Sequence, residues 1–347
     1  MRTAVYERYG APEVVRITEA DEPEIGEHEV LVRVEASTVG ASDSAGRSGT
    51  PRFARLFFGL TKPKHQVLGS DFAGVVERVG AQVRRFAAGD RVFGTVAPAS
   101  GAHAELLKIA DDGPIAHVPE RLDQAQAVAT VDGFLTALPF LRDVADVQPG
   151  QVVLVNGASG TVGTAAVQLA RHFGATVVGV CSAAHEPLVR SLGAERVIDY
   201  TRDDFAAERE TYDVIFDAVG KRSFRACRAA LTRRGIYLTT VPSGPIMLQA
   251  PFTRWFSRGR RAAIAFTGLR DPRTKAEELD LLVELIVAGE IVPVIDMVVP
   301  FDDIVEAHRR VDTGHKAGSV VVAMTPSRGQ PAGAARPETA AHEESAA

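Results

Sequence analysis

Three glycines spaced three residues apart, Gly157, Gly160 and Gly163, form the stretch with the clearest chemistry. Glycines have no Cβ, so backbone N–H groups in such a turn can approach a pyrophosphate, and the start of a following helix favours negative charge. The expected ligand is therefore a dinucleotide. The residues expected to hold it, including the end of the preceding strand, are Asn156, Gly157, Ala158, Ser159, Gly160, Thr161, Val162 and Gly163.

The elements around the glycines have the order that this chemistry requires. An apolar run at 152–155 precedes them, and a helix-period segment and a second apolar run at 177–180 follow. Strand, tight turn, helix and strand within about 30 residues form one βαβ unit, which is the context that a dinucleotide-binding turn needs. The competing interpretation is a glycine-rich loop in an unrelated α/β protein.

The end of the second strand of this unit indicates which dinucleotide is bound. Enzymes that use NAD usually carry an Asp or Glu there, which binds the ribose hydroxyls and would repel a 2′-phosphate. Here the strand ends in Cys181 and Ser182, without an acid. NADPH is therefore favoured, and Ser182 could hydrogen-bond its phosphate. His185 could supply part of the missing positive charge, or could be an ordinary residue at the start of a helix.

Composition limits the remaining classes of function. The chain has 347 residues, 46% hydrophobic and 24% charged, and a formal net charge of −5, which describes an ordinary globular protein and gives no reason to expect nucleic-acid binding. Its two cysteines, Cys181 and Cys227, form no metal-binding or disulfide pattern. No apolar stretch is long enough to span a bilayer, and the first residues do not form a signal sequence. A cytoplasmic enzyme is expected.

Strand and helix patterns predict two domains in an α/β protein. Residues 1–122 hold several short alternating strands, typical of an antiparallel barrel or sandwich. Residues 123–270 alternate strands and helices, which predicts a doubly wound parallel sheet. Residues 271–324 are expected to return to the first domain, because its sheet would otherwise keep open edges. Residues 325–347 lack large apolar side chains and are expected to be disordered.

One segment, 242–261, combines bulky apolar residues with arginines. It could be a lid over a substrate pocket, a dimer contact, or a surface-lying amphipathic piece near lipid. A packed crossover between the fifth and sixth strands of the parallel sheet is the interpretation that we favour.

Several separate stretches resemble those of one family, the medium-chain dehydrogenase/reductases, in its zinc-free quinone oxidoreductase-like branch. They lie at 1–15, 67–80, 87–94, 155–171, 191–200, 212–220 and 314–322. The resemblance implies a GroES-like catalytic domain built from both ends of the chain, a central Rossmann domain, NADPH in the cleft between them, and a homodimer. It also implies that Tyr200 contacts the 2′-phosphate and that Thr136 lies near the nicotinamide; Val241 is expected near the carboxamide.

The resemblance also identifies what is missing at the substrate end. Zinc-dependent members place metal ligands at positions that match Gly40, Ser70 with Asp71, and Asp132, and glycine cannot ligate a metal. No metal is therefore expected. Asp43, Asp71 and Asp132 could surround a hard cation, but isolated aspartates more often cap turns or form salt bridges.

Quinone reductases of this branch carry an Asn-Pro-x-Glu/Asp-x-Tyr pattern near the nicotinamide. Here residues 40–45 read GASDSA, so only the acid, Asp43, is kept. Ser42 and Asp43 are the predicted catalytic residues, facing the substrate carbonyl; a capping or solvated pair on a loop is the alternative.

These observations favour NADPH-dependent reduction of a quinone or of the C=C bond of an α,β-unsaturated carbonyl compound, with no zinc and with water as the proton source. Two alternatives stay open. One is a non-catalytic NADPH-binding protein, acting as a redox sensor or binding RNA as some relatives do. The other, a zinc-free alcohol or ketone reductase, fits less well because nothing polarises a simple carbonyl.

Overall fold

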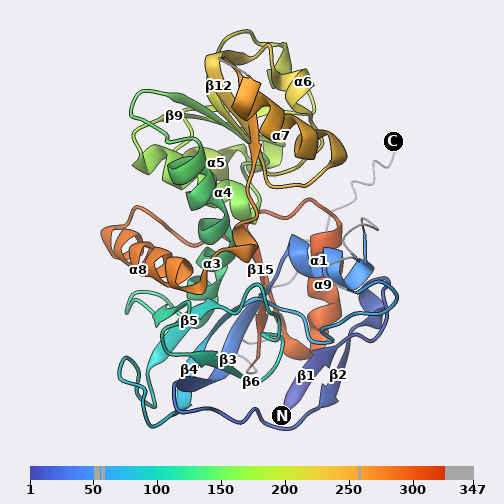
Figure 1. Cartoon of the computed structure of the whole chain (residues 1–347), viewed down its shortest axis with the longest axis vertical. Coiled ribbons are helices and arrows are strands. Elements are labelled where there is room, and N and C mark those ends of the chain that lie inside the picture. The colour runs from blue at the N-terminus through green and yellow to red at the C-terminus, as the bar shows by residue number, and fades with distance from the viewer. Residues whose placement is uncertain (51–54, 56–58, 257–258, 325–347) are drawn as a thin grey trace, which may run out of the picture.

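The computed structural model describes residues 1–50, 55, 59–256 and 259–324. The described chain is built around two large sheets, one above the other in Figure 1, and the helix α3 (Gln124–Leu138) lies between them. The predicted disorder of residues 325–347 and part of the segment 242–261 fall outside the described residues.

The lower sheet is formed by both ends of the chain. In the described residues it has seven strands, in the order β14-β15-β3-β4-β5-β7, with β6 also paired to β3. These strands are β3 (Glu29–Val39), β4 (Asp71–Val79), β5 (Arg91–Thr95), β6 (Leu106–Ala110), β7 (Ile115–His117), β14 (Ile295–Pro300) and β15 (Ser319–Ala323). A separate pair, β1 (Arg2–Val5) and β2 (Arg16–Glu19), lies beside it. Because β15 pairs with β3, the late strands close an edge of the early sheet, as predicted.

One feature of the lower sheet differs from the prediction. Its pairs are antiparallel except for β14 and β15, which run parallel. The helix α9 (Ile304–Asp312) connects these two strands and supplies the crossover that a parallel pair needs.

The upper sheet has the predicted parallel, doubly wound arrangement. Its strand order among the described residues is β10-β9-β8-β11-β12-β13, with parallel pairing throughout. The strands are β8 (Val152–Asn156), β9 (Thr176–Cys181), β10 (Arg196–Asp199), β11 (Tyr212–Asp217), β12 (Leu231–Thr239) and β13 (Arg261–Ile264). Strand order reverses between β8 and β11, and in such sheets ligands bind at the carboxyl ends of the strands where this reversal occurs.

The remaining helices are α1 (Ala41–Ser48), α4 (Thr161–His172), α5 (Glu186–Ser191), α6 (Phe224–Cys227), α7 (Gly244–Phe256) and α8 (Pro272–Ala288). Short 3₁₀ turns lie at Pro12–Val14, Ala183–His185, Phe205–Ala207, Thr267–Leu269 and Phe301–Asp303, and a π-helical turn at Pro139–Val144. The helix α1 was not predicted, because its small polar residues give no apolar period. The helix α6 is short, because β12 already begins at Leu231 and pairs there with Tyr212.

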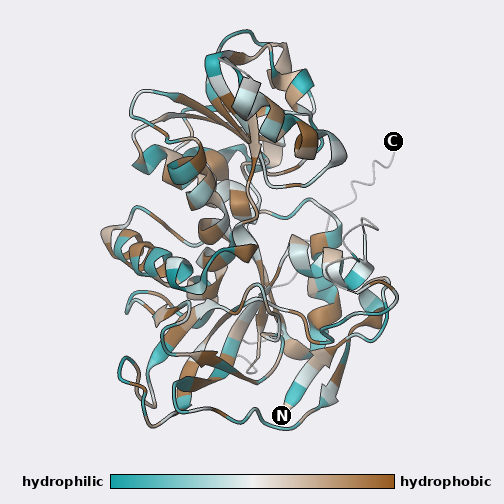
Figure 2. Cartoon of the chain, viewed as in Figure 1, coloured by the Kyte–Doolittle hydropathy of each residue, from teal (hydrophilic) through white to brown (hydrophobic). Residues whose placement is uncertain are grey.

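The helix α3 joins the two halves of the molecule. Its apolar side chains, including Phe134 and Leu138, are fully buried in one core with β8 and β9. The helix α3 also packs closely against α4, since a Cβ on Gly133 would lie 2.5 Å from the carbonyl oxygen of Thr161 in α4. The helix α8 adds Leu279 and Leu282 to the same core, and in Figure 2 it shows both hydrophobic and hydrophilic residues along its length.

The segment 242–261 forms a crossover, as predicted. The helix α7 leads from β12 to the parallel strand β13, with Ile246 buried in the core beneath it. Its other side carries four strongly exposed apolar side chains, Met247, Leu248, Phe252 and Trp255. The proposed lid and dimer-contact roles of this segment stay predictions.

The buried His308 of α9 makes the fold sensitive to acid. Neither of its ring nitrogens has a hydrogen-bond partner among the described residues. Burial, helped by the charges of His103 and Arg47, lowers its pKa from 6.5 to about 2. Below pH 6.5 the unfolded chain binds a proton that the folded chain excludes, so stability should fall by about 1.4 kcal/mol per pH unit.

We expect His308→Leu to remove this loss, because leucine cannot take up the proton. Urea unfolding at pH 7 and pH 5 measures it: the variant should lose about 2 kcal/mol less than the wild type over this interval. Replacing the exposed His28 by Gln is the matched control and should keep the wild-type dependence. Equal acid sensitivity in His308→Leu would contradict the assignment.

Candidate active site

The glycine turn lies at the carboxyl end of β8, beside the strand-order reversal. Gly157 has a φ of +83°, which favours glycine. A Cβ on Gly163 would lie 2.0 Å from the carbonyl oxygen of Gly157, so the turn and the first turn of α4 pack backbone against backbone. Gly160 is the N-cap of α4 and has no side-chain cap, which leaves N–H groups at the start of the helix for a ligand. This geometry fits the phosphates of a dinucleotide.

The predicted 2′-phosphate residues lie at the ends of adjacent strands. Ser182 follows β9 and Tyr200 follows β10, and the N–H of Tyr200 donates to the carbonyl oxygen of Cys181. The Tyr200 side chain is exposed, whereas Ser182 is half-buried with its Oγ 3.5 Å from Nδ1 of His185. An acidic residue, Asp199, lies between them in the sequence, and its Oδ1 accepts from the N–H and the hydroxyl of Thr201.

A buried carboxylate shapes the loops on the other side of the glycine turn. Asp217, fully buried at the end of β11, accepts from the Asn156 amide at 2.8 Å and from the Tyr237 hydroxyl at 2.6 Å. It also accepts from the N–H groups of Val219 and Gly220, each at 3.0 Å. These bonds fix the loop that contacts the turn.

Two residues that were predicted to contact the cofactor belong to this arrangement. Asn156 is a partner of Asp217, so its amide orients this carboxylate. Val241 packs on the same loop, since a Cβ on Gly220 would lie 2.5 Å from its Cβ. The loops after β8, β11 and β12 thus meet at one edge of the sheet.

The predicted catalytic pair lies at the start of α1. Asp43 is buried and accepts from the N–H of Gly40 at 2.8 Å and from the N–H of Gly69 at 2.9 Å. Both carboxylate oxygens are therefore engaged in capping α1 and joining it to the turn before β4. The Ser42 side chain is exposed. Asp43 thus positions this turn, and a direct role of Ser42 or Asp43 in chemistry stays a prediction.

The missing side chain of Gly40 leaves a notch lined by oxygen atoms. A Cβ placed on Gly40 would lie 3.6 Å from Ser42 Oγ and 3.7 Å from Oδ2 of both Asp43 and Asp132. Asp132 belongs to α3, one turn before Thr136. The Gly40 notch therefore brings together Gly40 and Asp132, two of the positions that match metal ligands of zinc-dependent members.

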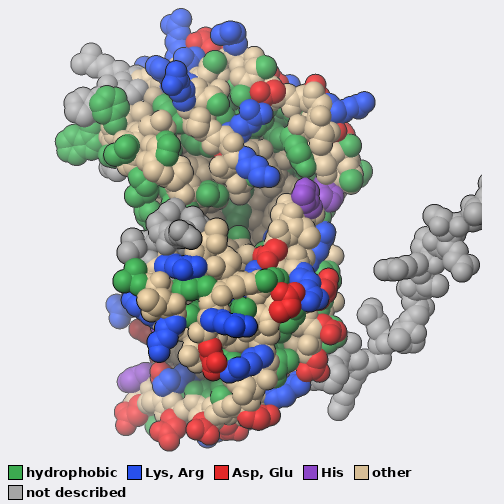
Figure 3. Space-filling view, turned by 90° about the vertical axis from the view of Figure 1, so that its right-hand side faces the viewer, with side chains coloured by type: hydrophobic (Ala, Val, Ile, Leu, Met, Phe, Trp, Pro, Cys, Tyr) green, Lys and Arg blue, Asp and Glu red, His purple; other side chains and the backbone are tan. Residues whose placement is uncertain are grey.

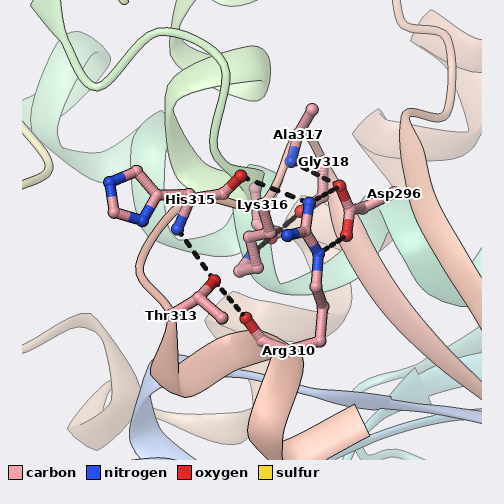
Figure 4. Close-up of polar contacts among 8 residues, drawn as sticks. Asp296, Arg310, Thr313, His315, Lys316, Ala317 and Gly318 are labelled. Atoms are coloured by element: carbon pink, nitrogen blue, oxygen red, sulfur yellow. Dashed lines mark hydrogen bonds and ion pairs between the residues drawn. The ribbon is translucent and has the colours of Figure 1, made fainter. Parts of the chain in front are cut away.

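A return loop, residues 313–318, carries Lys316 to the same region. The Arg310 guanidinium grips Asp296 with two hydrogen bonds of 2.6 and 2.8 Å, and Asp296 also accepts from the N–H of Ala317 at 2.7 Å (Figure 4). Gly318 donates its N–H to the carbonyl oxygen of Ser159 in the glycine turn. The loop is thus fixed between α9 and the turn.

Within this loop Lys316 points its ammonium group into the protein. Its Nζ donates to the carbonyl oxygen of Gly318 at 2.7 Å and to the Thr161 hydroxyl at the start of α4. Burial lowers the pKa of Lys316 to about 8, and the charges of Asp132 and Asp296 act against that shift. Figure 3 shows that one face of the molecule is hollowed where the upper and lower halves meet.

Comparison with known proteins agrees with this architecture. The family model described as "Alcohol dehydrogenase GroES-like domain" matches residues 26–116, and "Zinc-binding dehydrogenase" matches residues 192–322. A 2-methylene-furan-3-one reductase from Solanum lycopersicum is 30% identical over 94% of this chain and 80% of its own. The chain belongs to the medium-chain dehydrogenase/reductase superfamily.

Solved structures of quinone oxidoreductases in this superfamily have the same fold. That from Coxiella burnetii superposes with a TM-score of 0.81 at 27% identity, over 94% of this chain and 99% of its own. That from Escherichia coli, solved with NADPH, superposes with a TM-score of 0.78 at 25% identity, over 93% and 100%. The α/β architecture of a GroES-like part and a Rossmann-type parallel sheet is thus confirmed, and the superfamily is one of NAD(P)-dependent oxidoreductases.

The residues of this medium-chain dehydrogenase/reductase do not fit a catalytic zinc ion. Gly40 offers no donor atom where zinc-dependent members have a ligand, and Ser70 is a poor one. Within the described ranges, no three His, Cys, Asp or Glu side chains are placed to hold a metal. No described helix is long and apolar enough to cross a membrane.

Sequence reasoning missed the electrostatics of the Gly40 notch. Burial and the neighbouring Asp132 carboxylate raise the pKa of Asp71 well above its usual value. Burial raises the pKa of Asp132 as well, with Asp43 adding to the shift and Lys316 and Thr136 opposing it. The sequence suggested only a possible metal-binding role for Asp132. It suggested no role for Lys316, which lies in one of the stretches that carry the family resemblance. No local pattern marks these residues, because their pKa values depend on burial.

Proposed function

We propose that this protein is a zinc-independent, NADPH-dependent reductase of quinones or of the C=C bond of α,β-unsaturated carbonyl compounds. The observation that carries the proposal is the placement of the glycine turn near the Gly40 notch: a turn suited to phosphates, close to an oxygen-lined space in which Gly40 supplies no zinc ligand. Relatives named as a furanone reductase and quinone oxidoreductases support the substrate class. A homodimer and a cytoplasmic location are part of the same proposal.

In this proposal the chain's own residues bind and orient the reactants. The N–H groups of residues 157–163 hold the pyrophosphate, Ser182 and Tyr200 hold the 2′-phosphate, and Thr136 and Val241 border the nicotinamide. When bound, NADPH supplies hydride to an electrophilic carbon. The oxygen of the substrate then gains negative charge, which the Ser42 hydroxyl stabilises by donating a hydrogen bond.

A substrate panel tests the reaction. We expect purified protein to oxidise NADPH in the presence of one or more quinones or enones, monitored by loss of absorbance of the reduced nicotinamide, without added zinc and with chelator present. NADPH binding, detected by fluorescence, without turnover of any panel member would overturn the reductase assignment and favour a non-catalytic binding protein.

Cofactor choice should depend on Ser182. We expect a higher kcat/KM for NADPH than for NADH, and we expect Ser182→Asp to lower the value for NADPH about 100-fold while leaving that for NADH nearly unchanged, because the new carboxylate repels the 2′-phosphate. The same change at the exposed Ser191 of α5 is the control and should alter neither value. A wild-type preference for NADH would contradict the NADPH assignment.

A further inference from the structure

The proposed reduction needs a proton as well as a hydride, and the Gly40 notch holds a group placed to supply it. Asp132 Oδ2 lies 3.7 Å from the point where a Cβ on Gly40 would be, so this oxygen lines the space left by the missing side chain. The other carboxylate there, Asp43, is already engaged by two backbone N–H groups. Asp132 is thus the acid of the notch whose oxygen is not used to cap the chain.

The surroundings of Asp132 raise the pKa of its carboxyl group above the ordinary aspartate value. Burial raises its pKa, and Asp43 raises it further. Asp71, whose own pKa is raised by burial and by Asp132, is a second acid in the same cluster. A carboxyl group that keeps its proton can donate it to a developing oxyanion.

Two neighbours act against these effects: the Lys316 ammonium group, and the Thr136 side chain, which hydrogen-bonds to the Asp132 carboxyl group. Lys316 lowers the pKa of Asp132, and its ammonium group is fixed by hydrogen bonds to Gly318 and Thr161. The Arg310–Asp296 pair in turn holds the loop that carries Lys316 (Figure 4). The position of Lys316 relative to the Gly40 notch is therefore set by the tertiary structure.

We propose that the Asp132 carboxyl group is the proton donor of the reaction, delivering its proton to the substrate oxygen in the Gly40 notch, and that Lys316 is a positioning residue that controls how readily this proton leaves. This inference rests on the proposed reductase function and replaces water as the immediate donor.

The step balances for both substrate classes. After an enone has accepted hydride at its β-carbon, the π electrons form an enolate; the O–H bond of Asp132 breaks, and a new O–H bond forms on the substrate oxygen. The resulting enol becomes the saturated ketone in water. A quinone that accepts one hydride and this one proton becomes a hydroquinone. In each case water returns a proton to the Asp132 carboxylate.

The principal test is Asp132→Asn, which keeps the size of the side chain but removes the acidic proton. We expect kcat at saturating NADPH to fall about 100-fold, the effect typical of losing a general acid. The NADPH dissociation constant from fluorescence titration should stay within about twofold of wild type, because Asp132 lines the notch and not the glycine turn. Urea unfolding checks that the variant is folded.

The pH dependence of kcat/KM distinguishes the proton donor, Asp132, from the positioning residue, Lys316. Wild-type kcat/KM should fall as the pH rises through the raised pKa of Asp132, and Asp132→Asn should lack this fall. Lys316→Met should move the fall to higher pH, since it removes the cation that lowers the pKa of Asp132. Lys316→Arg keeps a cation at this position, so its kcat/KM should fall at nearly the same pH as that of the wild type. A fall that persists in Asp132→Asn and vanishes in Lys316→Met would make Lys316 the donor and overturn the proposal.

A measurement without cofactor or turnover gives an independent readout. In ¹³C NMR of protein labelled at aspartate carboxyl carbons, the Asp132 resonance is the one absent from Asp132→Asn. Its titration should give a pKa above the ordinary aspartate value of 3.8, and this pKa should be higher still in Lys316→Met. Titration at or below that value would overturn the proposal. If the wild type reduces panel substrates and Asp132→Asn is equally active, the donor assignment fails while the reductase function stands. If the wild type reduces none, both fail.

Discussion

Replacing Gly163 by alanine is expected to destabilise the protein by about 3 kcal/mol, at the upper end of the usual cost of overpacking. The new Cβ would lie 2.0 Å from the carbonyl oxygen of Gly157 and 2.8 Å from Cα of Ala158. Both neighbours are backbone atoms, so the turn itself must move. The gain of about 1 kcal/mol in helix propensity is too small to offset this. The displaced turn should also weaken NADPH binding about 100-fold, which corresponds to about 2.7 kcal/mol.

Gly160 in the same turn offers a matched comparison. A Cβ there would meet nothing closer than the Gly157 carbonyl oxygen at 3.6 Å, and the φ of −77° suits any residue. Gly160→Ala should therefore keep the wild-type unfolding midpoint in urea, yet weaken NADPH binding, because the methyl group stands where a pyrophosphate must approach. Gly268→Ala, with no atom within 4 Å, should change neither property. Normal NADPH affinity in both Gly160→Ala and Gly163→Ala would refute the assignment of the turn.

Removing the Asp217 carboxylate should have a comparable effect on stability, for a different physical reason. Asp217→Ala leaves the Asn156 amide and the N–H groups of Val219 and Gly220 without their buried acceptor, while the Tyr237 hydroxyl can still donate to the carbonyl oxygen of Arg222. Each unsatisfied donor costs about 1–3 kcal/mol, partly relieved by rearrangement, so we expect a loss of about 4 kcal/mol. Urea unfolding measures it.

Asp217→Asn is the informative companion. The oxygen of the new amide can still accept from the N–H groups of Val219 and Gly220. The NH₂ group of the new amide can donate to the Tyr237 hydroxyl, and this hydroxyl still donates to the carbonyl oxygen of Arg222 at 2.9 Å. The expected loss is therefore only about 1 kcal/mol. Replacing the exposed Asp302 by alanine should be nearly neutral. If Asp217→Ala unfolded at the wild-type urea concentration, these hydrogen bonds would not determine the stability of the loop.

Both predictions concern the cofactor end of the site, where the sequence was most informative. The strand β8 occupies Val152–Asn156 and β9 occupies Thr176–Cys181, matching the predicted apolar runs at 152–155 and 177–180 closely. Buried parallel strands and the helices between them leave continuous local patterns, and the glycines mark the turn directly. The boundaries proposed for the domains, at 122, 270 and 324, stay predictions.

The substrate end was much less visible in the sequence. The helix α1 has too few apolar residues to show a period, and its start depends on the Asp43 carboxylate reaching back to the N–H of Gly40. Gly40, Asp71 and Asp132 match positions at which zinc-dependent members of the family have metal ligands. Such a match does not say what these residues do in a protein without zinc.

The sequence by itself predicted the parallel sheet and the glycine turn, because both depend on local spacing, and its resemblance to a family predicted the superfamily. Only the tertiary structure brought Asp132, from a helix between the sheets, to the Gly40 notch, and Lys316, from the returning end of the chain, close enough to Asp132 to lower its pKa. Their protonation depends on burial and on the charges of residues far away in the sequence. Such properties exist only when the chain is folded, and the proposed proton donor depends on them.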